Sequence, residues 1–517
     1  MSRINTNIPS IISQQNLMRS SKELSLRFER LSTGLKINRG ADDPAGLIIS
    51  ERIKSDIQGV NTGIKNSERA SSVISTTEAA LNEVSDLLNS IKSLIVEAAN
   101  TGGNSVEERQ ANQLQIDSAI DTITRISNTA SFGGLKLLNG ALDYNLSSVK
   151  TSAITKVQVN NASLVNASSL QVTVDVVTSA QRAGLYYNPG TTNPGRLLSA
   201  MTIEVRGSIG TQVLQFPQSA PLSSVVAAVN NITAFTGVTA SLINATAASG
   251  ITFNSSGYGS DQMVSVQRIG GPAGSGDSFT QNLYKLNNNA DPTTLGSPAN
   301  WALTDLARAT NDTGQDVAAL VNGSLANGRG LRLPVNSSSF GAEILLNRDF
   351  AIRPAAANSV FYVTGGGALF QLGQNVTALQ QSNVGVPSMA ATRLGGTLVN
   401  GVLQYLSSVK TGQGNSISES LARGDFTAAS EILDRSIDEV STLRGRLGAF
   451  ERNVLQTNVR SLQSAFENLT ASNSQIRDAD FAAETSALSR AQILSSAGTN
   501  VLGLANQQSQ QVLQLLG

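Results

Sequence analysis

Few residues of this chain have the types and spacing that chemistry requires. Asp42 and Asp43, beside Arg39, form the kind of carboxylate pair that binds a cation, but no convergent ligand set accompanies them. We interpret Asp43 as the cap of a helix that begins at Pro44, where a missing N–H costs nothing. The sequence contains no His and no Cys, which removes the Ser-His and Cys-His catalytic pairs, disulfides and thiolate metal sites.

The middle of the chain, about residues 160–400, offers no catalytic constellation either. Its Asp, Glu and Lys residues are scattered without a pattern. We therefore predict that the chain is not an enzyme and has no cofactor and no metal site. An outer-domain adhesin or carbohydrate binder is an alternative, for which Trp301 and the Tyr186–Tyr187 pair are the aromatic candidates.

Composition excludes two classes of partner. Lys and Arg together number 37, as do Asp and Glu, so no global charge favours nucleic acid or an acidic membrane surface. No apolar run is long enough for a transmembrane helix, and residues 1–15 lack the features of a secretory signal.

Long helices are the elements that must position the remaining side chains. From Ile53 to Ala98, apolar residues recur in steps of four and three, as in the a/d seam of a heptad. One helix over this stretch is about 70 Å long, and its narrow stripe requires partner helices of similar length. Its strongest predicted packing residues are Ile74, Leu81, Val84, Leu88, Ile91 and Ile95.

Shorter seams with the same spacing occur near both ends of the chain. We predict a joint between helical segments at 40–44 and another at Asn473–Ser474. The first seam contains Leu17, Leu24, Phe28 and Leu31. The C-terminal seam contains Ile437, Val440, Leu447 and Val454, slips by one residue at Leu455, and continues through Leu462. A last helix begins near Asp478 and Asp480 and includes Val501, Leu504 and Leu515. By themselves these seams most simply predict an intramolecular helical bundle, and packing between subunits requires further evidence.

The middle has a different composition and a different period. Ten of the twelve prolines lie between Pro189 and Pro387, and alternating residues such as 170–176 predict strands. We predict a hairpin from 201–205 and 213–216 and a short helix at 222–230. Residues 317–322 echo that helix and suggest a small β/α module used twice. The hexapeptide at 146–151 recurs letter for letter at 406–411, which predicts two neighbouring strands or turns.

Motifs at both ends resemble those of one family, the bacterial flagellins. The resemblance covers roughly residues 1–140 and 420–517. It rests on the sequences at Leu31–Asn38, Asp42–Leu47, Glu97–Gly102, Ile476–Glu484, Ala505–Gln507 and Gln511–Leu513. It implies a structural subunit that self-assembles into the helical flagellar filament used for motility, exported unfolded through the flagellar type III apparatus and located outside the cell.

The resemblance also implies an architecture. The fold is expected to be mostly α at both ends, with long antiparallel helices in a coiled-coil-like bundle, and with an inserted β-rich α+β outer domain. Residues 1–43 with 473–517 would form the inner tube, 44–160 with 400–472 the long-helix core, and 161–399 the exposed outer domain. Three glutamines near the C-terminal end are candidates to line the central channel: Gln508, Gln511 and Gln514.

Partners implied by the resemblance are other subunits, an export chaperone, the filament cap and hook-junction proteins. Some flagellins activate a Toll-like receptor through a patch on the long helix, with an arginine at the place of Ser90. Here Leu94 matches that patch and the arginine is absent, so recognition is predicted to be weak because serine cannot replace a guanidinium fork. A hook–filament junction protein of the same family is the alternative function.

Overall fold

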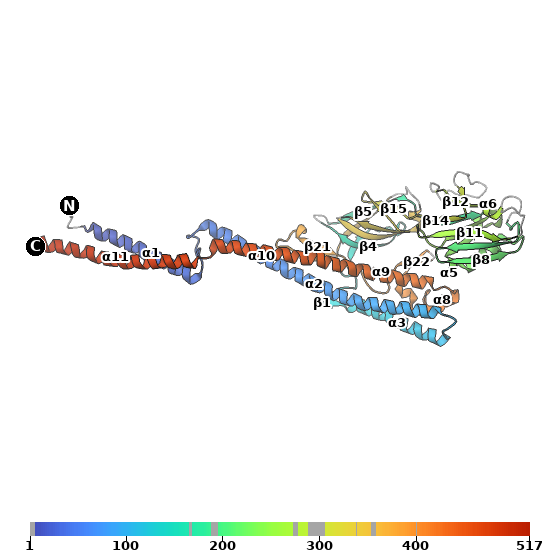
Figure 1. Cartoon of the computed structure of the whole chain (residues 1–517), viewed down its shortest axis with the longest axis horizontal. Helices are drawn as coiled ribbons and strands as arrows, with labels where there is room; N and C mark the ends of the chain where they lie inside the picture. The colour runs from blue at the N-terminus through green and yellow to red at the C-terminus, as the bar shows by residue number, and fades with distance from the viewer. Residues whose placement is uncertain are drawn as a thin grey trace. The chain divides into compact units, whose positions relative to one another are not determined.

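The computed structural model describes the chain except for residues 1–5, 165–167, 188–194, 272–277, 288–305, 338, 353–357, 400 and 517. Internal contacts divide it into two units. The terminal unit comprises Met1–Ala70, Gln371–Gln380 and Arg452–Gly517, and the central unit comprises Ser71–Phe370 and Gln381–Glu451. Figure 1 shows that the first contains the two chain ends and the second all the large sheets.

The terminal unit is built from helices. They are α1 (Ile8–Thr33), the first part of α2 (Pro44–Ala99), α10 (Gln456–Arg477) and α11 (Phe481–Leu516). Asp43 caps α2 as predicted, because its Oδ1 accepts a hydrogen bond from the Gly46 N–H at 2.9 Å. Asp480 likewise caps α11 by accepting from the N–H of Ala482 at 2.9 Å.

Two of the sequence predictions about joints and registers have different outcomes. The joint predicted at Asn473–Ser474 exists but lies further along the chain, because α10 continues to Arg477 and α11 begins at Phe481. Between them, the chain forms a bridge between Asp478 and Leu35. The one-residue slip near Leu455 is confirmed as a physical feature. A π-helical turn, Glu451–Leu455, separates α9 from α10 and absorbs the extra residue.

Helices in the central unit bury the long seam. The second part of α2 lies beside α3 (Val106–Thr129) and α9 (Thr427–Phe450), as Figure 1 shows, and α8 (Ile417–Arg423) contacts α3. A capping box lies at the start of α3, with reciprocal hydrogen bonds between Ser105 and Glu108. Short elements complete this region: β1 (Ser131–Phe132), β2 (Leu135–Lys136), β22 (Thr397–Val399), β23 (Val402–Gln404) and the 3-10 helix Leu406–Val409.

Two antiparallel β-modules make up the rest of the central unit. The first β-module has sheets β16-β15-β5-β19-β3 and β17-β18-β4 around one core. Its strands are β3 (Tyr144–Ser147), β4 (Ile154–Ala162), β5 (Leu170–Thr178), β15 (Ala318–Val321), β16 (Ser324–Asn327), β17 (Arg332–Asn336), β18 (Phe340–Leu346) and β19 (Ser359–Gly366), with the helical turn α7 (Arg348–Ala351).

The second β-module has sheets β13-β12-β6-β10-β9 and β14-β11-β7-β8 around its own core, which α4 completes. Its strands are β6 (Gly184–Tyr187), β7 (Met201–Gly207), β8 (Thr211–Phe216), β9 (Val238–Leu242), β10 (Ile251–Ser255), β11 (Met263–Gly270), β12 (Leu283–Leu286), β13 (Leu306–Arg308) and β14 (Asn311–Thr313). Its helices are α4 (Leu222–Asn231), α5 (Thr233–Thr236) and α6 (Ser278–Gln281).

Most of the strands expected in the middle are confirmed, and one helix is not. The hairpin of β7 and β8 and the helix α4 lie where they were predicted. The second helix, at 317–322, is wrong: this stretch is strand β15, and Val317, Ala319 and Val321 are buried on alternate positions. Pairing with β5 and β16 imposes the period of two, so the two β-modules do not repeat one β/α unit.

Candidate assembly surface

The two terminal helices α1 and α11 lie side by side, as Figure 1 shows, and are joined by a narrow seam. On α11 the seam consists of Glu484, Ala491, Gly498 and Ala505, which follow one another at intervals of seven residues. The alanines and Glu484 are less than a tenth exposed. A Cβ placed on Gly498 would lie 3.3 Å from Leu17 Cδ1 of α1. Small residues therefore let the α1 leucines approach the α11 backbone.

A cluster of charged side chains connects the two helices at one end of this seam. Arg27 Nη1 lies 2.8 Å from Glu484 Oε2, and Arg30 Nη1 lies 3.1 Å from Oε1. Burial acts to raise the pKa of Glu484, but the hydrogen bonds and positive charges of the two arginines outweigh it and lower the pKa. At the opposite end, Asn7 Nδ2 donates to the Ala505 carbonyl oxygen at 3.0 Å. The pair of helices is thus fixed in register at both ends.

Gly498→Leu is expected to weaken the α1–α11 pairing by about 1–3 kcal/mol, because overpacking a close contact forces the helices apart. Thermal unfolding of the terminal helices, followed by circular dichroism, measures this loss. Gly503→Leu is the matched control, since a Cβ at Gly503 meets nothing within 4 Å. Equal effects of the two substitutions would contradict the small-residue seam.

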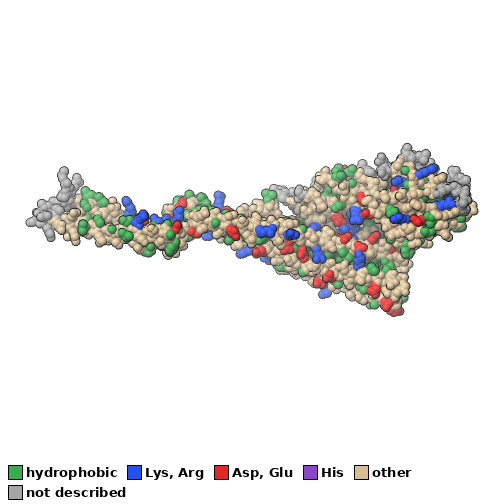
Figure 2. All heavy atoms as spheres, viewed as in Figure 1, with side chains coloured by type: hydrophobic (Ala, Val, Ile, Leu, Met, Phe, Trp, Pro, Cys, Tyr) green, Lys and Arg blue, Asp and Glu red, His purple; other side chains and the backbone are tan. Residues whose placement is uncertain are grey.

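The terminal helices expose large apolar side chains outside this seam. On α1, Ile8, Ile11, Ile12 and Met18 are each 46–59% exposed, and the 100° spacing of helical residues places them away from Leu17 and Leu24. On α11 the exposed set is Phe481, Ile493, Leu494, Val501 and Leu504. Figure 2 shows hydrophobic side chains along the surface of this helix pair. Contiguous exposed apolar surface of this kind marks a protein–protein interface.

The predicted seam residues fall into three groups. Those buried inside the central unit are Ile74, Leu81, Val84, Leu88, Ile91, Ile95, Val440 and Leu447. Those half-buried are Leu17, Leu24, Leu31, Ile437, Val454 and Leu462. Those exposed are Phe28, Val501 and Leu504, while the side chain of Leu515 lies outside the described residues. The first group is thus buried in the central unit, and each side chain of the third group is more than half exposed.

The channel and receptor candidates all lie on helices. Gln508 and Gln511 are exposed on α11, and the side chain of Gln514 lies outside the described residues. Ser90 is exposed and Leu94 is half-buried on α2. Between them, Lys92 forms an ion pair with Asp434 of α9, so the one charge of this short run is already neutralised within the chain.

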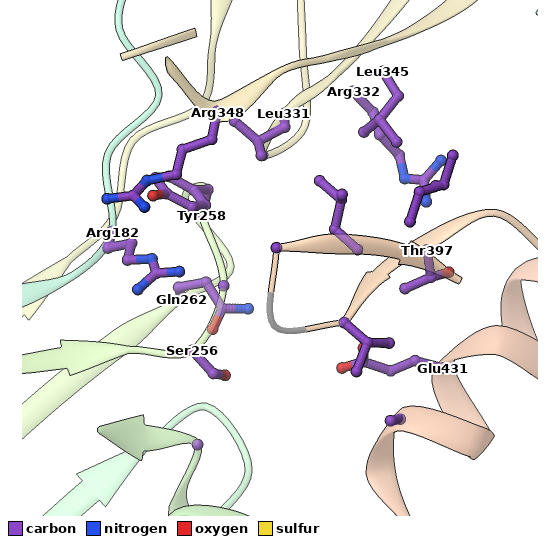
Figure 3. Close-up of a pocket in the computed structure, with 18 of the residues that line it drawn as sticks. Arg182, Ser256, Tyr258, Gln262, Leu331, Arg332, Leu345, Arg348, Thr397 and Glu431 are labelled. Atoms are coloured by element: carbon purple, nitrogen blue, oxygen red, sulfur yellow. The ribbon is translucent and has the colours of Figure 1, made fainter. Parts of the chain in front are cut away.

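A cavity of about 900 Å³ opens in the central unit between the two β-modules, the hairpin of β22 and β23, and α9 (Figure 3). Arg182 Cζ stacks 4.7 Å from the ring centroid of Tyr258, and Arg332 Nη1 pairs with Glu343 Oε1 at 3.2 Å. Within the described part of the chain, no group of three or more potential metal ligands occurs. The described residues that line the cavity therefore contain no such cluster of metal ligands.

Of the aromatic candidates for carbohydrate binding, Tyr187 is buried and Tyr186 is half-buried. Tyr187 is 1% exposed and packs with its ring centroid 4.6 Å from that of Phe279. Burial raises its pKa to about 12. Tyr187 is thus a core residue and cannot stack on a sugar, while Trp301 lies outside the described residues.

None of the helices, over the residues that the structure describes, combines enough length and hydropathy to cross a bilayer.

Comparison with known proteins identifies relatives of the helical ends and of the whole chain. The family model described as the bacterial flagellin N-terminal helical region matches residues 4–143, and that of the C-terminal helical region matches residues 430–516. B-type flagellin of Pseudomonas aeruginosa is 30% identical over 517 residues and covers 99% of both chains. Flagellin of Salmonella rubislaw is 29% identical over 524 residues, again with 99% coverage of each chain.

Solved structures include distant neighbours. Flagellar hook associated protein-3 of Legionella pneumophila is 11% identical, with a TM-score of 0.31 over 82% of this chain and 98% of that chain. The values are too low for an argument about this fold, so the sequence relatives carry the comparison.

Proposed function

Because this chain belongs to the bacterial flagellin family, we propose that it is a structural subunit that self-assembles into the helical flagellar filament used for motility. The observation that supports this most directly is the exposed apolar surface of α1 and α11. A subunit with two complementary faces that do not close on each other grows into an open helical polymer. The family is one of structural proteins, not of enzymes.

We propose a separate role in the filament for each of three parts of the chain. Residues 1–43 with 473–517 form the inner tube, and 44–160 with 400–472 form the wall around it. The middle, 161–399, projects outward and carries most of the two β-modules, whose strands β3 and β4 begin before it. The buried α2–α9 core supports a wall subunit that is folded before it packs, whereas the terminal helices leave large apolar side chains for neighbouring copies to cover.

Export unfolded through the flagellar type III apparatus, to the outside of the cell, is part of this proposal. A chain without Cys cannot form accidental crosslinks while threaded. The partners that we propose are an export chaperone, the filament cap and the hook-junction proteins. The exposed amides of Gln508 and Gln511 suit a wet central channel, and Gln514 continues the same proposed lining.

We expect the purified chain, seeded with short filament fragments, to grow into tubes that electron microscopy resolves as helical. Chains trimmed of residues 1–43 and 473–517 are expected to stay soluble under the same conditions. An intact chain that remains a monodisperse particle after seeding would overturn the function, as would tube growth by the trimmed chain. A junction protein would differ in being scarce in filaments sheared from cells.

Weak activation of the Toll-like receptor is expected from the patch around Ser90. Loss of one charge-assisted hydrogen bond of about 1.5–3 kcal/mol reduces affinity by roughly tenfold or more. A reporter-cell assay comparing this chain with its Ser90→Arg variant measures the effect, and the variant is expected to be the more potent. Equal potency of the two, at the level of a family member with the arginine, would refute this prediction.

A further inference from the structure

A hairpin loop of the terminal unit carries two unusually exposed apolar side chains. The loop Gln371–Gln380 connects β20 (Ala368–Gln371) to β21 (Gln381–Val384) through a 3-10 turn at Ala378–Gln380. Val376 is 86% exposed and Leu379 is 88% exposed, more than any other large hydrophobic residue in the described part of the chain. We refer to Val376 and Leu379 as the hydrophobic tip.

Hydrogen bonds within the loop hold the tip outward. The Asn375 N–H donates to Gln380 Oε1 at 2.6 Å, and Gln371 Nε2 donates to the Asn375 carbonyl oxygen at 2.7 Å. The Leu372 N–H donates to the Gln380 carbonyl oxygen at 2.9 Å, and the Gln380 N–H donates to that of Thr377 at the same distance. Because both sides of the loop are tied, its apolar side chains cannot fold back without breaking these bonds.

The loop is also fixed on the long helices. A Cβ on Gly59 would lie 3.0 Å from Gln374 Cβ, and one on Gly63 would lie 3.0 Å from the Leu372 carbonyl oxygen. Asn458 Nδ2 of α10 donates to that same carbonyl oxygen at 2.9 Å. Glycine is unfavourable inside a helix, and the close approach of the loop gives a physical reason for two of them one turn apart in α2.

We infer that the hydrophobic tip is a contact with a second copy of this chain in the polymer. The inference rests on the proposed function and adds to it a contact outside the helices. The ten residues 371–380 contain no charged side chain, so the loop presents nothing for an ionic partner such as nucleic acid or a lipid headgroup. The loop contacts α2 and α10, so the tip lies next to helices that the proposed function places in the tube wall.

Exposed apolar surface on the same unit supports a copy of the chain as the occupant. Ile48 is 71% exposed and Ile49 is 51% exposed near the start of α2. Both precede Gly59 and Gly63 in the same helix. Head-to-tail contacts between two different patches of identical subunits are the kind that propagate a polymer. A stiff apolar tip fits that role because little conformational entropy is lost when it is covered.

Accessibility of a single introduced thiol tests the contact, since the chain has no Cys of its own. Val376→Cys and Leu379→Cys variants are labelled with a maleimide as soluble subunits and after seeded growth. Leu325→Cys is the control, because Leu325 is 61% exposed on β16 of the central unit. We expect labelling at both tip positions to slow at least ~10-fold in the polymer, because interface cores exclude water, and the control to change less than about twofold.

A second measurement uses the Val376→Ser/Leu379→Ser variant, whose substitutions lie at exposed positions and preserve the subunit fold. Its critical concentration for growth is expected to rise at least ~10-fold, because the buried apolar area is lost. Unchanged labelling of the tip in tubes, or an unchanged critical concentration, would overturn the inference while leaving the proposed function intact. Failure of the unaltered chain to form tubes would instead overturn both.

Discussion

Replacing Ile493 and Leu504 of α11 with aspartate is expected to abolish polymer growth and to leave the subunit folded. Each side chain is 67% exposed, and their separation of eleven residues places them on one side of the helix, away from Ala491 and Gly498. Burying two such side chains contributes about 1.5–3 kcal/mol each, and aspartate adds the cost of an unpaired buried charge. The critical concentration is therefore expected to rise by at least ~100-fold.

Light scattering during seeded growth measures this effect, and circular dichroism checks that the helices are retained. Val213→Asp is the matched control, since Val213 is 49% exposed on β8 of the second β-module. That variant is expected to grow like the unaltered chain. Normal growth of the α11 variant would show that this face of α11 has no part in assembly.

The long seam was predictable because it is strong and repetitive. Leu81, Val84, Leu88 and Ile91 are all fully buried at their expected spacing, since a stripe maintained over many turns leaves one consistent solution. The register slip near Leu455 was visible for the same reason. An extra residue in a seven-residue pattern must be absorbed locally, and here a π-helical turn does so.

The seam between α1 and α11 was not predictable by looking for large apolar residues. That approach selects Val501 and Leu504, which the structure leaves more than half exposed. The true α11 seam uses Ala491, Gly498 and Ala505, whose small size permits close approach of α1. Their exact spacing of seven, together with Glu484, was the available signal.

Identical short sequences also do not predict identical structure where their tertiary partners differ. The hexapeptide repeated at 146–151 and 406–411 was expected to form two neighbouring strands or turns, and its two copies differ in conformation. Leu146 lies in strand β3 and pairs with Val363 of β19, whereas Leu406 begins a 3-10 helix and its N–H donates to the Leu394 carbonyl oxygen at 2.9 Å. Hydrogen-bonding partners supplied by distant segments decide between such short conformations.

Glu484→Gln is expected to weaken the α1–α11 pairing by about 2–3 kcal/mol near neutral pH, because it leaves two guanidinium groups without their charged acceptor. Glu484 is 7% exposed and accepts from both Arg27 and Arg30. Glu23→Gln is the matched control. Glu23 lies 3.7 Å from Arg27 with its side chain 50% exposed, and such exposed pairs contribute less than about 1 kcal/mol.

The same charge centre makes the helix pair sensitive to acid. The pKa of Glu484 is lower in the folded chain than in the unfolded chain, so the folded state binds fewer protons as acid is added. The stabilisation is fully present above the ordinary glutamate pKa of about 4.3 and is lost as pH falls through the lower folded value. Thermal unfolding of the terminal helices across this range is expected to show a steeper acid-induced loss in the unaltered chain than in the Glu484→Gln variant. Identical pH profiles for the two proteins would mean that Glu484 is not the titrating group.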